Sequence, residues 1–220
     1  MPTSGVTAWS LTARDIITAA LQENAIVGLG RTPTATEAEA CMVRLNGMLK
    51  SWPAYGLHET TGTVTLPAND ASGTLAAGIK RITSARLELT GGTQRQLGEW
   101  NRDDYLILPN KAASGNPTIF YQARQLAGIT LYVWPVPTAI KTLHIDYERV
   151  PETVTDLSQT VDFPQEYQEC LYANLALRCA GLFGVEPGGE LIARAQRLER
   201  AMLDAERPES YVFEPGGYCA

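Results

Sequence analysis

The hydrophobic period of this chain changes twice along its length, and these changes constrain the fold more than any other feature. At both ends, apolar residues recur at the spacing of one face of a helix. Between about residues 60 and 150 they fall instead in short β-branched and aromatic runs bounded by Gly, Asn, Asp and Pro. The pattern predicts an α+β protein. Its expected parts are an N-terminal helical hairpin (1–58), an inserted antiparallel β-rich, sandwich-like domain (59–150), a C-terminal hairpin that completes a four-helix bundle (151–207), and an extended C-terminal arm (208–220).

Two helices are expected in the first hairpin. The first should begin near Thr12, which has capping-box spacing to Asp15, and should end at Gly28 and Gly30. The second should follow the capping box of Thr34 and Glu37 and stop before Pro53 and Gly56. The apolar stripes are Ile16, Ile17, Ala20 and Leu21 in the first helix, and Ala38, Cys41, Met42, Leu45, Met48, Leu49 and Trp52 in the second.

Two more helices are expected in the second hairpin. The one from about Pro164 to Val185 has Arg178 as its only charge after Cys170, so it should be buried on nearly every side, in the core or between subunits. The last, from about Gly189 to Arg207, carries an apolar stripe of Leu191, Ala195, Leu198, Met202 and Ala205. We expect bundle or interface packing from Leu45, Met48, Leu49, Trp52, Leu171, Leu175 and Leu182.

Six runs predict strands in the middle of the chain. They read TTGTVTL, IKRITSARLEL, DYLIL, TIFYQAR, ITLYVWP and LHIDYERV. In one of them, Ile129, Leu131 and Val133 should face one side of a sheet, and the residues between them the other. Such runs indicate an antiparallel sandwich or a small barrel.

Composition limits the classes of partner. A formal net charge of −6 argues against general affinity for duplex DNA, although an acidic wall suits a channel through which DNA slides. No apolar stretch is long enough to cross a membrane, and the N-terminus lacks the pattern of a secretory signal. Reduced core thiols are the expected state of the four cysteines, Cys41, Cys170, Cys179 and Cys219.

No motif for catalysis or for a cofactor stands out. His58 and His144 lack partners at metal-ligand spacing, and neither a nucleophile elbow nor a phosphate-binding loop occurs. Two carboxylate pairs, Asp103 with Asp104 and Glu166 with Glu169, leave glycoside hydrolysis open. The simpler interpretation is a polar turn for the first pair and a complement to a helix dipole for the second. We therefore expect no enzyme and no cofactor.

Several segments together resemble a known family. They are ARDIITAAL, the end of the second helix at Leu45-Asn46 and Ser51-Trp52, then NPTIFYQAR, ITLYVWPVPT, IDYERVPE and VDFPQEYQECLYANLALRCAGLFGV. Their order, over roughly residues 10 to 205, resembles the head-to-tail adaptor, or packaged-DNA stabilisation, proteins of short-tailed bacteriophages.

The resemblance implies a structural protein of the virion at the head–tail junction, assembled in the host cytoplasm. Such adaptors form a dodecameric ring under the portal ring, extend the channel for duplex DNA without sequence-specific binding, and carry the downstream tail (nozzle) protein. The resemblance also implies a C-terminal arm that reaches the portal. We take Tyr211, Phe213 and Tyr218 as its anchors, since aromatic residues dominate binding hot spots; a tail folded back on its own chain is the alternative.

Three other functions stay open at this point. One is a neck or head-completion protein of a long-tailed phage, and the second is a virion-associated peptidoglycan hydrolase that uses the paired carboxylates. The third is a carbohydrate-binding sandwich, for which Trp100, Tyr105, Tyr132 and Trp134 are the candidate contacts.

Overall fold

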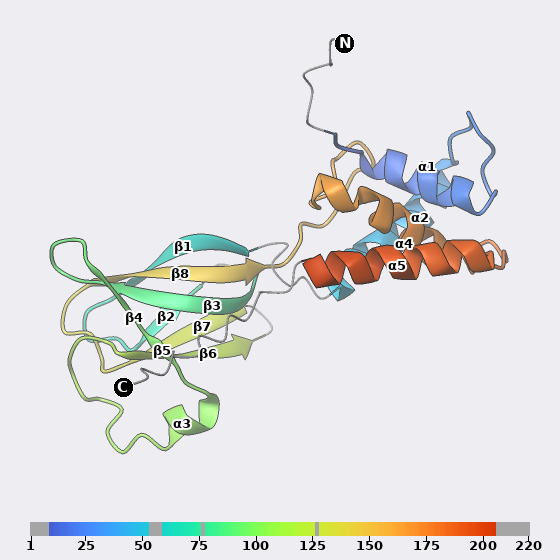
Figure 1. Ribbon diagram of the computed structural model, residues 1–220. Coiled ribbons are helices and arrows are strands. Elements are labelled where there is room, and N and C mark those ends of the chain that lie inside the picture. The colour runs from blue at the N-terminus through green and yellow to red at the C-terminus, as the bar shows by residue number, and fades with distance from the viewer. Residues whose placement is uncertain (1–8, 53–58, 76–77, 126–127, 206–220) are drawn as a thin grey trace, which may run out of the picture. The chain divides into compact units, whose positions relative to one another are not determined.

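The chain forms two compact units, one helical and one built of strands (Figure 1). The computed structural model describes residues 9–52, 59–75, 78–125 and 128–205. The helical unit combines residues 1–57 with residues 153–220, and the β unit comprises residues 58–152. The prediction of a mixed α+β protein is confirmed by five α-helices and two four-stranded sheets among the described residues.

The first two helices begin where their capping boxes predict. Helices α1 (Ala13–Glu23) and α2 (Ala35–Ser51) each have a threonine N-cap whose side chain accepts from the third helical N–H. In return, the backbone N–H of Thr12 donates to Asp15 Oδ2 over 3.0 Å, and that of Thr34 donates to Glu37 Oε2 over 2.8 Å. Both caps therefore satisfy donors that a helix start otherwise leaves unpaired.

The end of α1 differs from the prediction. The helix stops at Glu23, before Gly28, because Ala25 adopts a left-handed conformation with φ of 54°. The Ile26 N–H then donates to Leu21 O over 3.0 Å, and the Ala25 N–H donates to Gln22 O over 2.9 Å. This is a Schellman motif, and it pairs the last carbonyls of the helix without the glycine that the sequence argument required.

The predicted third helix is also too long. Instead of one helix over 164–185, a 3-10 turn (Gln165–Tyr167) leads into α4 (Gln168–Ala180). After Ala180 the chain continues in tighter turns, with the Leu182 N–H bonded to Cys179 O, until the left-handed Gly184, with φ of 65°, turns the Val185 N–H back to Ala180 O over 3.1 Å. The last helix, α5, spans Gly189–Ala205. Its stripe is confirmed at Leu191, Ala195 and Met202, which are buried, whereas Ala205 is exposed.

One core joins α1, α2, α4 and α5. All four predicted core residues of α1 and the predicted α2 positions Cys41, Leu45, Met48, Leu49 and Trp52 belong to it, with Leu171, Leu175 and Cys179 of α4. Polar bonds at its edge tie helices that lie far apart in sequence. Asn24 Nδ2 donates to Ala176 O over 2.7 Å, and Arg194 Nη2 lies 2.6 Å from Glu23 Oε1.

Two sheets form the β unit and bury one core between them. The first contains β1 (Glu59–Leu66), β8 (Lys141–Arg149), β3 (Ile79–Glu88) and β4 (Gln94–Gln96), in that order. The second contains β2 (Ser72–Thr74), β7 (Gly128–Trp134), β6 (Ile119–Gln125) and β5 (Gly98–Glu99). Neighbours are antiparallel except β5 and β6. The alternation predicted for β7 is confirmed, since Ile129, Leu131 and Val133 are buried and the residues between them are half-buried.

One predicted strand is wrong. The run DYLIL is not extended, because Asn101 accepts from the Asp104 N–H over 2.8 Å and starts a short helix, α3 (Arg102–Leu106). An asparagine N-cap followed by two aspartates is a helix-start pattern, and it outweighs the β propensity of the next four residues. The short strands β2, β4 and β5 were not predicted at all.

We predict that the Glu37 cap stabilises the fold in a pH-dependent way. The backbone N–H and the hydroxyl of Thr34 bond its carboxylate and hold the pKa of Glu37 below its ordinary value. A lowered folded-state pKa contributes stability above the unfolded pKa, which is lost as pH falls through the folded pKa. Glu37→Ala should therefore lower the free energy of unfolding at pH 7, and the deficit should shrink below about pH 4. Urea titrations followed by far-ultraviolet circular dichroism measure this. Glu39→Ala, which removes an exposed carboxylate of the same helix, is the matched control.

Candidate functional site

The carboxylates considered for hydrolysis lie at helix starts. Asp103 and Asp104 occupy the first turn of α3, Glu166 lies in the 3-10 turn, and Glu169 lies in the first turn of α4. The two pairs belong to different units. A carboxylate in the first turn is stabilised by the unpaired N–H groups and by the positive end of the helix dipole. Each position thus has a sufficient structural explanation.

The buried thiols are core residues. Cys41, Cys170 and Cys179 are free and buried. Burial raises the pKa of Cys170 to about 12, and the hydrogen bond with Cys41, together with burial, raises the pKa of Cys179. A thiol with a raised pKa is a poor nucleophile at neutral pH, so Cys170 and Cys179 act in packing. Cys219 lies outside the described residues.

The aromatic residues considered for carbohydrate binding instead hold a loop on the second sheet. Tyr105 of α3 stacks on Tyr121 of β6 with ring centroids 5.4 Å apart, and Tyr121 stacks on Tyr132 of β7 at 5.9 Å. The Trp134 indole N–H donates to Asn110 O over 2.9 Å. Burial, with a smaller effect from Tyr132, raises the pKa of Tyr105. Tyr105, Tyr132 and Trp134 are therefore occupied in fastening the segment that contains α3.

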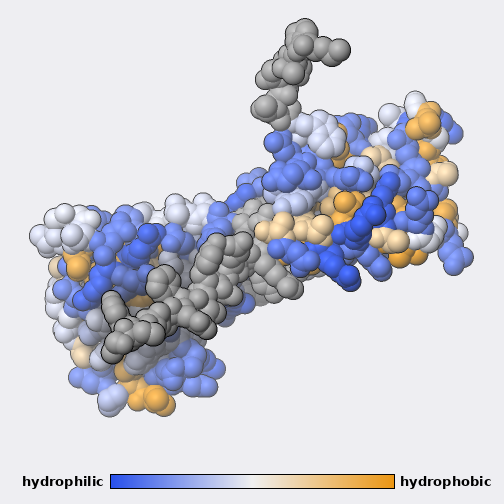
Figure 2. Space-filling view, viewed as in Figure 1, coloured by the Kyte–Doolittle hydropathy of each residue, from blue (hydrophilic) through white to orange (hydrophobic). Residues whose placement is uncertain are grey.

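The C-terminal end of α3 exposes two large apolar side chains next to charged ones. Leu106 is 49% exposed and Ile107 is 78% exposed, and Figure 2 shows a small hydrophobic patch among hydrophilic atoms at this end of the β unit. Beside them lies a shallow pocket of about 480 Å³, lined by Trp100, Asp104, Ile107, Leu108 and Pro109. Trp100 is the only aromatic candidate that lines it. Exposed apolar groups around a pocket are typical of a contact surface for protein.

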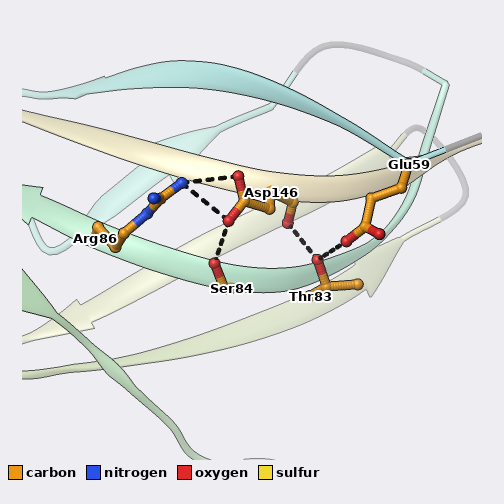
Figure 3. Close-up of polar contacts among 5 residues, drawn as sticks. All are labelled: Glu59, Thr83, Ser84, Arg86 and Asp146. Carbon is orange, nitrogen blue, oxygen red and sulfur yellow. Dashed lines mark hydrogen bonds and ion pairs between the residues drawn. The ribbon is translucent and has the colours of Figure 1, made fainter. Parts of the chain in front are cut away.

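The outer face of the first sheet is polar (Figure 3). Arg86 of β3 pairs with both carboxylate oxygens of Asp146 of β8, at 2.8 and 2.9 Å, and Ser84 donates to the same carboxylate. The register of β3 against β8 shifts between Ile82 and Ser84, and the hydroxyl of the intervening Thr83 lies 3.0 Å from Asp146 O. This cross-strand network fixes the register at a bulge.

The described part of the chain contains one of the two histidines considered as metal ligands. His144 lies on the polar face with Nε2 3.1 Å from Glu88 Oε2, and His58 lies outside the described residues. Among described residues, no three His, Cys, Asp or Glu side chains are grouped to hold a metal ion. No helix within the described ranges is long and apolar enough to span a membrane.

The end of α2 is the most informative site in the helical unit. Asn46 Nδ2 donates to Val154 O, and the Val154 N–H donates to Asn46 Oδ1, each over 2.9 Å. The Trp52 indole N–H donates to Glu199 Oε1 of α5 over 2.9 Å, and the indole packs on Phe163 with ring centroids 5.6 Å apart. Asn46 and Trp52 belong to the stretch from Leu45 to Trp52 (LNxMLxSW), and both bond groups from the other half of the chain, whereas Ser51 bonds Met48 O of its own helix.

The returning segment also caps α1. The Ala13 N–H donates to Gln159 O over 2.8 Å, and the Arg14 N–H donates to Leu157 O over 3.0 Å. With the Thr12 side chain on the third helical N–H, all of the first three donors of α1 are paired. Backbone carbonyls that lie more than a hundred residues later in the sequence thus pair the first N–H groups of α1.

The segments singled out in the sequence lie in both units, and they cover nearly the same range as a family match. A family model described as SU10 adaptor protein matches residues 11–213. The chain belongs to the SU10 adaptor protein family. This is a family of phage adaptors, so the chain is a structural component of the virion that contacts portal and tail proteins. No curated protein matches the chain.

The adaptor's predicted packing residues have different surroundings. Leu45, Met48, Leu49 and Trp52 of α2 and Leu171 and Leu175 of α4 lie in the core of the helical unit. Leu182 follows the end of α4 and is 41% exposed. The proposed arm anchors Tyr211, Phe213 and Tyr218 lie outside the described residues.

Some functional residues of the adaptor were missed by the sequence argument. Asn46 and Glu199 carry long-range bonds, but only the first stood in a noticed pattern, and nothing local marked Val154 or Glu199 as partners. The pocket residues Ile107 to Pro109 were assigned to a strand end and its turn. The asparagine N-cap at Asn101 was the available signal for α3.

We predict that Asn46 stabilises the adaptor through its two bonds to Val154. Asn46→Ala would leave both backbone groups of Val154, which is 4% exposed, without partners, at a loss of about 1–3 kcal/mol in the free energy of unfolding. Urea denaturation measures the loss. The neighbouring Gly47→Ala is the matched control. Its new Cβ meets nothing within 4 Å, so removal of a helical glycine should raise stability by up to about 1 kcal/mol.

A second prediction concerns Trp52 and Glu199. Glu199→Ala would leave a buried indole N–H unpaired, at about 1–3 kcal/mol. In a Trp52→Phe background, which has no such N–H, the same change should cost clearly less, and the double-mutant cycle gives the difference. Gln196→Ala, on an exposed part of α5, should be neutral in both backgrounds. Equal losses in both backgrounds would mean that the hydrogen bond contributes nothing.

Proposed function

We propose that the chain is a head-to-tail adaptor that forms a ring, a dodecamer by resemblance, beneath the portal of a short-tailed phage. The ring extends the DNA channel, retains the packaged genome and carries the tail. In this proposal α1, α2, α4 and α5 form a four-helix bundle on the portal side, and the β unit faces the tail.

The observation that carries the proposal is the family match over residues 11–213, which includes both units. The LNxMLxSW residues support it, because they are the residues that hold the two halves of the helical unit together. The peptidoglycan hydrolase is not favoured, since the candidate carboxylates are accounted for as helix-start residues. No described feature favours the long-tailed neck protein or the carbohydrate-binding sandwich as a second function.

The proposed mechanism is mechanical. Subunits join the portal after packaging, and burial of interfaces and ordering of arms supply the free energy without nucleotide hydrolysis. A net charge of −6 suits a channel wall that does not grip DNA.

The direct test mixes the purified chain with the portal protein of the same genome and examines the product by electron microscopy and native mass spectrometry. A closed ring stacked coaxially on the portal is the expected outcome. A chain that stays monomeric and does not bind the portal would contradict the proposal.

We predict that the arm supplies much of the portal affinity. Deletion of residues 208–220 should leave the circular dichroism spectrum and melting temperature nearly unchanged and weaken portal binding at least about tenfold, because aromatic anchors dominate such contacts. Joint replacement of Tyr211, Phe213 and Tyr218 by alanine should have a similar effect, whereas Ser210→Ala should not. Normal portal binding by the deletion variant would refute the arm assignment.

A further inference from the structure

The apolar pocket beside α3 is built on a fastened scaffold. Three stacked tyrosines anchor the helix to the outer face of the second sheet, with Tyr105 and Tyr132 centroids 5.7 Å apart. The Asn101 cap fixes the helix start, and the Trp134 bond to Asn110 O fixes the chain that follows it. Because the scaffold is already fixed, little conformational entropy is lost when a partner binds to the apolar lining of the pocket.

A second exposed apolar group lies on the same unit. Ile140, between β7 and β8, is 70% exposed and does not line the pocket of its own subunit. Its loop is held by backbone bonds, from the Val136 N–H to Ala113 O over 2.8 Å and from the Asn69 N–H to Pro137 O over 2.8 Å. The loop therefore presents Ile140 as a fixed apolar projection.

The two features have complementary charges. Asp104 is the only charged residue in the pocket lining, and its carboxylate forms no ion pair with described residues. Lys141, next to Ile140, is the only charged residue between Trp134 and Thr142, and it likewise has no described ion-pair partner. Pairing an apolar group with a pocket, and a lysine with an aspartate at its rim, gives both contact area and orientation.

We infer that Ile140 of one subunit seats in the pocket formed by Trp100, Asp104, Ile107, Leu108 and Pro109 of the neighbouring copy, with Lys141 beside Asp104. This rests on the proposed ring. Rotation about a ring axis preserves height and radius, so the β units of neighbouring copies lie at the same level, where one can contact the next. A projection and a pocket on the same unit are the two different surfaces that such a head-to-tail contact requires.

Cross-linking of assembled rings tests the contact. In a Cys219→Ser background, which leaves only buried native thiols, Ile140→Cys and Leu108→Cys are combined in the full chain. The variant is assembled with the portal of the same genome and treated with a short bismaleimide. A ladder of covalent oligomers is expected, because each copy is linked to two neighbours. Leu29→Cys combined with Leu108→Cys, which pairs the pocket with a 92% exposed leucine of the helical unit, should give no ladder.

Charge exchange tests the orientation. Asp104→Lys and Lys141→Asp should each reduce the ladder at least about tenfold, and the two together should restore it, since a reversed pair again attracts. Coaxial rings on the portal without any ladder would overturn this contact and leave the proposed function intact. A ladder that stops at the dimer, or that is indifferent to both charge changes, would also overturn it. If no ring assembled on the portal, this result would instead contradict the proposed function.

Discussion

Antiparallel pairing of β1 with β8 is the constraint on which the two-unit architecture depends. These are the first and last strands of the β unit, and they pair without a break from Glu59 opposite Glu148 to Leu66 opposite Lys141. The chain therefore leaves the β unit beside the point where it entered. The helical unit is split in sequence by about a hundred residues, and it needs this return to close its core at small cost in loop entropy. Glu59 and Glu148 face each other as like charges, and the Thr83 hydroxyl near Glu59 and the Lys80 ammonium 4.0 Å from Glu148 offset the repulsion.

A few side chains, each with two partners, then hold the two halves of the helical unit together. The Asn46 side chain bonds both the N–H and the carbonyl of Val154, as the backbone of a neighbouring strand would. Trp52 fills core space and still pairs its indole N–H with Glu199, so that the large ring is buried without an orphaned donor. Asn46 and Trp52 thus each join two segments that lie far apart in the sequence, and both act in packing and hydrogen bonding.

The sequence predicted a feature correctly wherever the residues that determine this feature lie within the same helix or strand. Both capping boxes, the stripe of α1 and the alternation in β7 follow from neighbours within four residues, and all are confirmed. The failures lie at element ends and in short elements. Ala25 ends α1 in a conformation that the sequence argument reserved for glycine, and α3 forms in a run of strand-favouring residues because Asn101 caps it and Tyr105 finds two tyrosines on the sheet.

The amino-acid sequence by itself determined the class of the fold, the starts of the first two helices, most of the core and the family, since these depend on periodicity and on short-range hydrogen bonds. Only the tertiary structure decided the strand order, the partners of Asn46 and Trp52, the helix in the α3 segment and the pocket beside it. The reason is physical. Each of these depends on groups brought together across tens of residues or more, and their closeness is set by β1–β8 closure and by core packing, which no local pattern records.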